Sequence, residues 1–189
     1  MNRAIRFIIR KITRRIRQLR YPFLTTNITI NRPFRIDGKN GIYIGGDSSF
    51  QSGLWMYSHV TDSSTGKISI GSNCSFGYNN HITSAGEVTI GDDVLTANNV
   101  YISDNIHGYE DILVPIMRQP IIFKNSVVIG SGAWIGENVS IIGARIGVNS
   151  VIGANSVVTK DVPDYCVAVG APAKVIRRFD LSTGLWKRV

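Results

Sequence analysis

The chain has 189 residues, a formal net charge of +8, 43% hydrophobic residues and two cysteines. This length allows one domain with one appendage, and two cysteines do not indicate a disulfide-rich secreted protein. No segment is long and apolar enough to predict a membrane-spanning helix.

The first twenty residues carry the whole net charge, because they contain eight Arg and Lys residues and no acid. Their aliphatic residues fall on one side of a helix, so we predict an amphipathic basic helix over residues 1–20. An arginine-rich face suits an anionic membrane surface, and we expect a location at the cytoplasmic face of the inner membrane. A helix packed on the protein itself is the alternative. Because the rest of the chain is neutral, we expect no nucleic-acid partner.

We predict that residues 21–43 form an irregular lead-in with short strands, because Asn, Pro and Gly interrupt the segment. A six-residue repeat follows over residues 44–163, and neither a helix nor an ordinary strand has this period. It is typical of a parallel β-helix, with one short strand per hexad and three hexads per coil. We place five coils at about 44–61, 70–87, 90–107, 129–145 and 146–163.

One residue of each hexad should point into the prism, and the Gly or Ala that often follows should allow a sharp turn. The predicted inward residues are Ile44, Phe50, Met56, Ile70, Phe76, Ile82, Ile90, Thr96, Ile102, Ile129, Ile135, Ile141, Ile146, Ile152 and Val158.

A long loop over residues 107–125 interrupts the repeat and contains Pro115 and Pro120. Long loops on a rigid scaffold are where function concentrates. Residues 164–189 form a closing segment after the last coil.

The chain resembles the hexapeptide-repeat acyltransferases over residues 40–178. The run "VIGANSVVTKDVPDYCVAVGAPAKVIRR" is similar to the closing coil and tail of acetyl-CoA-dependent O-acetyltransferases. The run "SDNIHGYED" resembles the histidine loop of the sugar and polysaccharide O-acetyltransferase branch. The resemblance implies an all-β, left-handed parallel β-helix that forms homotrimers. It also implies active sites between subunits and acetyl-CoA as the acyl donor, without a metal.

His107 is the candidate general base, since a positioned imidazole can take the proton of an acceptor hydroxyl near neutral pH. Asp104 and Glu110 are both candidates to orient it, and the sequence does not choose between them. Asn105 could bind the acceptor or the oxyanion. Asn80 could donate to the oxyanion and His81 could act across a subunit boundary, although a structural role for His81 is an equal alternative.

The resemblance assigns Trp134 to the wall of the pantetheine channel. The remaining candidates for coenzyme binding are small, rigid or basic residues near the end of the repeat, which would admit the cofactor to the backbone or pair with its phosphates. They are Gly153, Ala154, Lys160, Ala171, Pro172, Lys174, Arg177 and Arg178.

Three other functions are open. N-acetylation of a nucleotide-linked amino sugar uses similar chemistry, and a non-enzymatic β-helix scaffold would not need the His loop and basic tail together. The γ-type carbonic anhydrases hold zinc on this fold with three histidines. The offsets of His59, His81 and His107 within their coils predict that they do not share one face, so we expect no zinc site and no catalytic role for His59.

Overall fold

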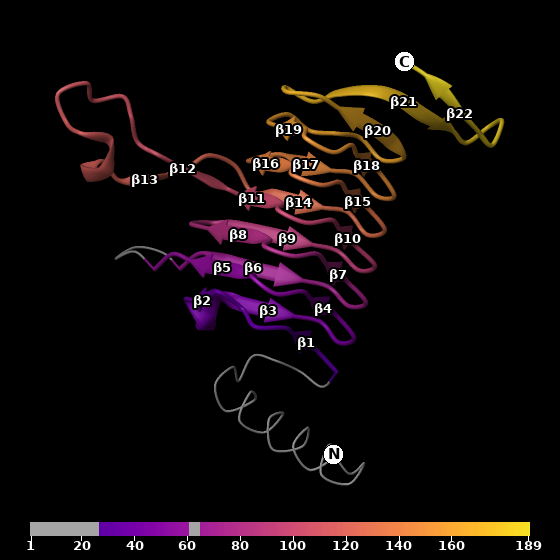
Figure 1. The fold of residues 1–189 in the computed structure, drawn as a ribbon. Helices are drawn as coiled ribbons and strands as arrows, with labels where there is room; N and C mark the ends of the chain where they lie inside the picture. The colour runs from indigo at the N-terminus through magenta and orange to yellow at the C-terminus, as the bar shows by residue number, and fades with distance from the viewer. Residues whose placement is uncertain (1–26, 61–64) are drawn as a thin grey trace, which may run out of the picture.

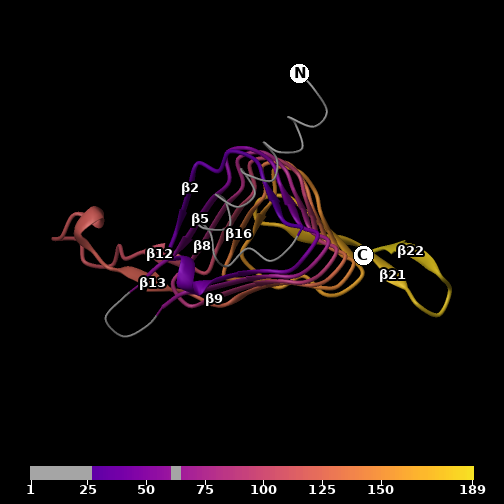
Figure 2. The ribbon, with the colours of Figure 1, turned by 90° about the horizontal axis from the view of Figure 1, so that it is seen from below.

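The computed structural model describes residues 27–60 and 65–189. The predicted arm (1–20) lies outside these residues, as do 21–26 of the lead-in. Within the described part, the chain winds into a triangular prism whose three sides are parallel sheets (Figures 1 and 2). No helix within residues 27–60 and 65–189 is long and apolar enough to cross a membrane.

One side of the prism is a nine-stranded sheet. Its strands up to β20 pair in parallel, and a final antiparallel hairpin closes it. In spatial order the strands are β1 (Thr29–Ile30), β4 (Ser49–Phe50), β7 (Ser75–Phe76), β10 (Leu95–Thr96), β15 (Trp134–Ile135), β18 (Val151–Ile152), β20 (Cys166–Val169), β21 (Lys174–Asp180) and β22 (Leu185–Arg188).

The second side is a six-stranded parallel sheet, made of β2 (Arg35–Asp37), β5 (Trp55–Ser58), β8 (His81–Ser84), β11 (Tyr101–Ser103), β16 (Ser140–Ile142) and β19 (Val157–Val158). The third is a five-stranded parallel sheet, made of β3 (Ile42–Ile44), β6 (Lys67–Ile70), β9 (Glu87–Ile90), β14 (Val127–Ile129) and β17 (Arg145–Ile146). A short 3₁₀ turn, η1 (Lys39–Gly41), precedes β3.

The core confirms the six-residue repeat, because all fifteen predicted inward residues are at most 4% exposed. They stack in register between coils: Phe50 lies beside Phe76, and Ile82 lies beside Ile102. The rings of Phe50 and Phe76 are stacked, with centroids 4.5 Å apart. Each coil therefore buries its inner face on its neighbours, which is how a solenoid builds a core.

The expected role of the repeat glycines as turn residues is wrong. The positive φ angles at the corners belong mainly to Asn and Asp, for example Asn79 (φ 56°) and Asn99 (φ 57°), whose side chains hydrogen-bond at 3.2 Å. Gly71 and Gly91 have no positive φ. A Cβ on Gly71 would lie 2.6 Å from the backbone of Gly91 in the next coil. These glycines therefore permit close stacking of coils.

The coiling begins earlier than residue 44. Strands β1, β2 and β3 pair in parallel with β4, β5 and β6 of the next coil, so residues 29–44 form a coil. Ile30 and Ile36 are buried and keep the six-residue step. The step then breaks at η1, which is why residues 21–43 looked irregular in sequence.

The long loop leaves the prism between β11 and β14 (Figures 1 and 2). Its root is a two-stranded antiparallel ribbon of β12 (Asn105–His107) and β13 (Ile121–Phe123), and its outer part contains the 3₁₀ turn η2 (Ile116–Arg118). The Gln119 side-chain amide donates to the carbonyls of Asp111 and Val114, each at 2.8 Å, which braces the outer part.

Candidate functional site

The outer face of the six-stranded sheet carries a cleft beneath the root of the loop. It has a volume of about 670 Å³. We call it the His107 cleft and define it by its lining residues: Trp55, Tyr57, His59, His81, Thr83, Tyr101, Asn105, Ile106, His107, Ile121 and Ile142. A cleft with aromatic walls and few polar groups is the usual form of a small-molecule site.

His107 is the last residue of β12 and stands opposite Ile121 of β13. The ribbon holds the backbone of His107 in place, and Gly108 continues it by donating to the Pro120 carbonyl at 2.8 Å. The imidazole is exposed at the cleft and has no hydrogen bond to another described residue. Its nitrogens are therefore free to meet a ligand.

Three aromatic side chains stand in one row on the floor of the cleft, because Trp55, His81 and Tyr101 occupy the same register position on β5, β8 and β11. The rings of Trp55 and His81 are parallel within 2°, with centroids 4.0 Å apart, and His81 to Tyr101 measures 5.1 Å. Burial lowers the pKa of His81 below its ordinary value of 6.5, which favours the neutral imidazole.

All three histidines line this one cleft, so the prediction that they do not share a face is wrong. The His59 ring lies 3.0 Å from the Thr83 hydroxyl and 4.1 Å from the Tyr57 ring centre. Burial lowers the pKa of His59, the charge of Asp104 partly opposes this, and His107 adds to it. Among the described residues, no three His, Cys, Asp or Glu side chains are grouped so that they could hold a metal ion.

Asp104 does not orient His107, which corrects one of the two sequence candidates. Its carboxylate is fully buried and already accepts four hydrogen bonds, each between 2.7 and 2.8 Å. The donors are the Ser84 hydroxyl, the amides of Ala85 and Gly86, and the Asn105 side chain. The Asp104 carbonyl also accepts from the Lys124 amide at 2.8 Å. Asp104 therefore fixes both strands of the loop root.

The other predicted catalytic residues lie in three places: at the cleft, on the loop and in the interior. Asn105 is 5% exposed and lines the cleft, while its Nδ2 donates to Asp104. Glu110 is exposed on the loop and has no hydrogen bond to a described residue. Asn80 is fully buried, and its Nδ2 donates to the carbonyls of Gly77 and Ala97 at 2.8 and 3.1 Å. Because these donors are occupied, the prediction of Asn80 as an oxyanion donor is wrong.

The predicted coenzyme residues gather on the nine-stranded sheet. Trp134, Val151, Val167 and Arg177 occupy one register position on β15, β18, β20 and β21, and we call them the Trp134 row. Trp134 is 51% exposed and Arg177 is exposed, while the two valines are partly exposed. At a strand spacing of about 4.8 Å, the row extends about 14 Å from an indole, over valines, to a guanidinium.

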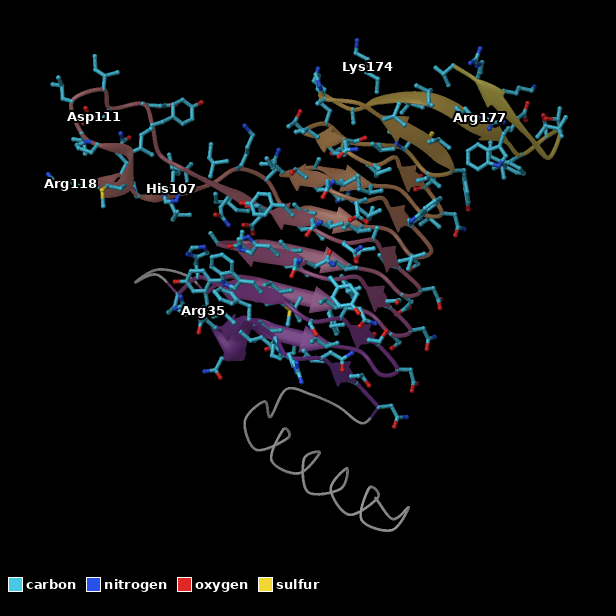
Figure 3. All side chains as sticks on the ribbon, in the orientation of Figure 1. Arg35, His107, Asp111, Arg118, Lys174 and Arg177 are labelled. Atoms are coloured by element: carbon cyan, nitrogen blue, oxygen red, sulfur yellow. The ribbon has the colours of Figure 1, made fainter. Side chains whose placement is uncertain are left out.

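The remaining coenzyme candidates surround the end of the Trp134 row or lie at a corner. Lys174 and Arg178 are exposed on β21, and Figure 3 shows Lys174 and Arg177 near the hairpin end of the molecule. Lys160 is exposed just after β19. The turns after β18 and β20 contain Gly153, Ala154, Ala171 and Pro172.

The His107 cleft and the Trp134 row lie on different sides of one prism. The loop with His107 leaves the edge between the six-stranded and five-stranded sheets, opposite the nine-stranded sheet that carries Trp134 (Figure 2). In the view of Figure 3, His107 stands at the left of the molecule, Lys174 at the top and Arg177 at the upper right. One chain therefore does not bring its own candidate base and coenzyme residues together.

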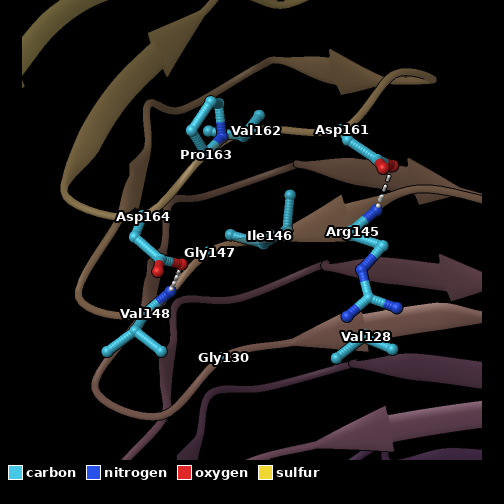
Figure 4. Close-up of a pocket in the computed structure, with 10 residues that line it drawn as sticks. All are labelled: Val128, Gly130, Arg145, Ile146, Gly147, Val148, Asp161, Val162, Pro163 and Asp164. Carbon is cyan, nitrogen blue, oxygen red and sulfur yellow. Dashed lines mark hydrogen bonds between the residues drawn. The ribbon is translucent and has the colours of Figure 1, made fainter.

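A second groove, of about 330 Å³, lies along the five-stranded sheet where it turns into β18. Asp161 accepts a hydrogen bond from the Arg145 amide and Asp164 accepts one from the Val148 amide, each at 2.8 Å (Figure 4). The two carboxylates thus cap backbone donors. None of the predicted site residues lines this groove.

Comparison with known proteins finds that the chain is similar to hexapeptide-repeat proteins. The family model "Hexapeptide repeat of succinyl-transferase" matches residues 67–104 and 126–160. A putative lipopolysaccharide biosynthesis O-acetyl transferase of Escherichia coli K12 is 40% identical over 115 residues, which cover 57% of this chain and 59% of that protein. The chain spans 46% to 61% of the length of the first curated relatives that it matches.

Two solved structures are similar. A maltose O-acetyltransferase from Clostridium difficile 630 has a TM-score of 0.54 and 29% identity, over 83% of this chain and 69% of that one. An N-acyltransferase from Bacillus cereus, in complex with dTDP and coenzyme A, has a TM-score of 0.65 and 17% identity, over 83% and 86%. The predicted resemblance to hexapeptide-repeat acyltransferases with sugar O-acetyltransferase relatives is confirmed.

Proposed function

We propose, from the premise that this hexapeptide-repeat chain is related to sugar O-acetyltransferases, that it transfers acetyl from acetyl-CoA to a sugar hydroxyl. The observation that carries the proposal is an exposed imidazole, His107, at an aromatic-walled cleft on this scaffold. The kinship with a lipopolysaccharide O-acetyl transferase supports a surface-polysaccharide sugar as the acceptor class.

His107 acts as the general base in this proposal. Its imidazole takes the proton of the acceptor hydroxyl while that oxygen attacks the thioester carbonyl carbon of acetyl-CoA. The C–S bond then breaks, the acetyl ester forms, and the CoA thiolate recovers the proton from the imidazolium. A positioned base contributes about 10²–10⁴ in rate, and an imidazole has a suitable pKa near neutral pH.

The Trp134 row suits coenzyme A along its length. The pantetheine arm is mostly apolar, and it would lie over Val151 and Val167. The phosphates carry negative charge, and Lys174, Arg177 and Arg178 offer cations at the end of the row. Charge-assisted pairs of this kind are about twice as strong as neutral hydrogen bonds.

A complete site then requires two copies of the chain, because the cleft and the row lie on different sides of one prism. We propose a homotrimer in which the His107 cleft of one subunit faces the Trp134 row of the next. Three equivalent sites would follow from this cyclic arrangement.

The test uses acetyl-CoA labelled in the acetyl group, with neutral oligosaccharides and amino sugars as competing acceptors. We expect label in a purified product that alkaline hydroxylamine releases, since oxygen esters are labile to it and amides are stable. Label found only in a hydroxylamine-stable product would establish N-acetylation in place of this proposal. Absence of transfer to both acceptor classes, with acetyl-CoA bound, would contradict an acetyltransferase function.

A further inference from the structure

We propose that the outer face of the six-stranded sheet, from the His107 cleft down to Phe34, is a binding wall for an uncharged glycan of several sugar units. We call it the glycan wall and define it by Phe34, Trp55, Tyr57, His81 and Tyr101. The inference rests on the proposed function and adds to it the length and charge class of the acceptor.

The wall continues well beyond the cleft. Below Tyr101, His81 and Trp55, the ring of Phe34 meets the Trp55 ring edge-on, with centroids 5.9 Å apart. Phe34 directly precedes β2 and is 73% exposed. From β11 to β2 there are three strand spacings of about 4.8 Å, so the rings extend over about 14 Å. This length exceeds one pyranose ring and matches a short run of linked sugars.

The side chains of the glycan wall offer a sugar both hydrogen-bonding groups and apolar aromatic surface. Trp55 and His81 stack face to face, so each ring covers one face of the other. Among the described residues, the phenol groups of Tyr57 and Tyr101 and the imidazole of His81 have no hydrogen-bond partner. Phe34 is exposed at one end of the row, and aromatic surface of this kind packs against apolar C–H groups. A glycan presents both hydroxyls and C–H faces, so it can satisfy both.

Charge favours a neutral glycan over a nucleotide-linked sugar. The residues that line the His107 cleft include no Lys or Arg in the part of the chain that the structure describes. At the far end of the wall, Arg35 is paired with Asp37. A diphosphate needs cations or aligned amide donors, and an aromatic wall without free cations leaves its charge unmatched. Three exposed basic side chains without an ion pair among the described residues, those of Lys174, Arg177 and Arg178, lie on β21, on another side of the prism.

The experiment measures binding, so that it does not depend on turnover. Maltotetraose, cellotetraose and chitotetraose, each with its methyl monosaccharide, are titrated onto the full chain and followed by NMR. We expect at least one tetrasaccharide to bind at least about tenfold more tightly than its monosaccharide, since the longer chain contacts several aromatic rings at once. The variant Phe34→Ala should remove most of that advantage and leave monosaccharide binding unchanged, because Phe34 lies outside the His107 cleft. The variant Trp55→Ala should weaken binding of both, because Trp55 also lines the cleft.

Tyr43→Ala is the matched control. Tyr43 is 58% exposed on β3, in the same coil as Phe34. Because it lies on the five-stranded sheet, its loss should not change glycan affinity. The inference is overturned if every tetrasaccharide binds no better than its monosaccharide, or if dTDP binds the wall more tightly than the glycans. It is also overturned if Phe34→Ala changes the oligomer mass and spares glycan binding, because the wall is then a subunit contact. Glycan binding without any acetyl transfer would uphold the wall and contradict only the proposed function.

Discussion

The carboxylate of Asp104 accepts a hydrogen bond of 2.7 Å from the hydroxyl of Ser84, and both side chains are fully buried. This contact joins the root of the long loop to the coil before it. The loop therefore starts from a fixed point, and the position of His107 three residues later depends on that point.

We predict that Asp104→Asn destabilises the protein by about 2 kcal/mol or more, since hydrogen bonds to charged groups contribute about 1.5–3 kcal/mol each. Each carboxylate oxygen accepts from one backbone amide, Ala85 or Gly86. In either orientation, the new side-chain NH₂ therefore faces a donor. Urea unfolding measures the loss, and acetyl transfer should fall mainly in kcat because His107 moves.

The control for this variant is Asp164→Asn. Asp164 is exposed and caps a single amide, that of Val148 (Figure 4). Its loss should cost much less stability than that of Asp104 and leave kcat unchanged. If the two variants lose the same amount of stability and kcat, the burial of Asp104 and its contacts at the loop root do not explain its effect.

We predict that His107→Ala lowers kcat/KM for acetyl transfer by at least about 10²-fold, which is the lower end of a general-base contribution. The fold should persist, because the imidazole makes no hydrogen bond to a described residue. Steady-state kinetics and circular dichroism measure the two quantities. Turnover near that of the unchanged protein would refute the assignment of the base.

We predict that the double variant Lys174→Ala, Arg177→Ala weakens acetyl-CoA binding mainly through the 3′-phosphate. Two lost charge-assisted contacts should weaken affinity by at least about tenfold, since each contributes about 1.5–3 kcal/mol before solvent screening at these exposed positions. Calorimetry with 3′-dephospho-CoA, which lacks that phosphate, should give the same affinity for both proteins. Arg145→Ala, on the five-stranded sheet, is the control and should bind acetyl-CoA normally.

Stability should fall on acidification below pH 6.5. Burial lowers the pKa of both His59 and His81 from 6.5, so the folded state takes up protons only at lower pH than the unfolded chain. The stabilisation is therefore present above pH 6.5 and is lost as the pH falls through the lowered values. The free energy of unfolding, measured between pH 5 and 7, should depend less on pH in the His59→Gln, His81→Gln variant. An unchanged slope would contradict the prediction.

The basic arm gives a prediction that rests on sequence alone. Deleting residues 1–20 should abolish binding to vesicles of anionic lipid and leave acetylation of a soluble acceptor largely intact. The expected basis is apolar insertion plus about 1 kcal/mol per basic residue near the surface. Added salt should weaken binding of the full chain, since exposed charges are screened beyond about 8 Å at physiological ionic strength. If the full chain ignores anionic vesicles at low salt, the arm has another role.

The sequence predicts the core well, for a physical reason. A six-residue period is local, so Ile82 and Ile102 can be placed inward without knowing the fold, and the row of Trp134 follows from the same spacing. The place of His59 could not be predicted in this way. His59 follows the last residue of β5, and only the register between β5 and β8 brings it to Thr83 in the cleft.

Asp104 and Asn80 show the second reason for error. Both are polar residues near a histidine in the sequence, and both turn their polar atoms to backbone and hydroxyl groups of neighbouring coils. A solenoid leaves polar groups at its corners that must be satisfied internally. In such a fold, proximity in sequence to a candidate base is weak evidence of a shared site.

The reversal of chain direction at β21 has a consequence for polymerisation. A prism of parallel strands ends in open backbone groups, and such an end can template the addition of another molecule. Here β21 runs antiparallel over β20, and β22 then forms the outer edge with Lys187 and Arg188. Basic side chains on an edge strand oppose pairing with a second copy. The hairpin that we propose as the partner of the coenzyme phosphates therefore also opposes end-to-end growth of fibres at this end of the prism.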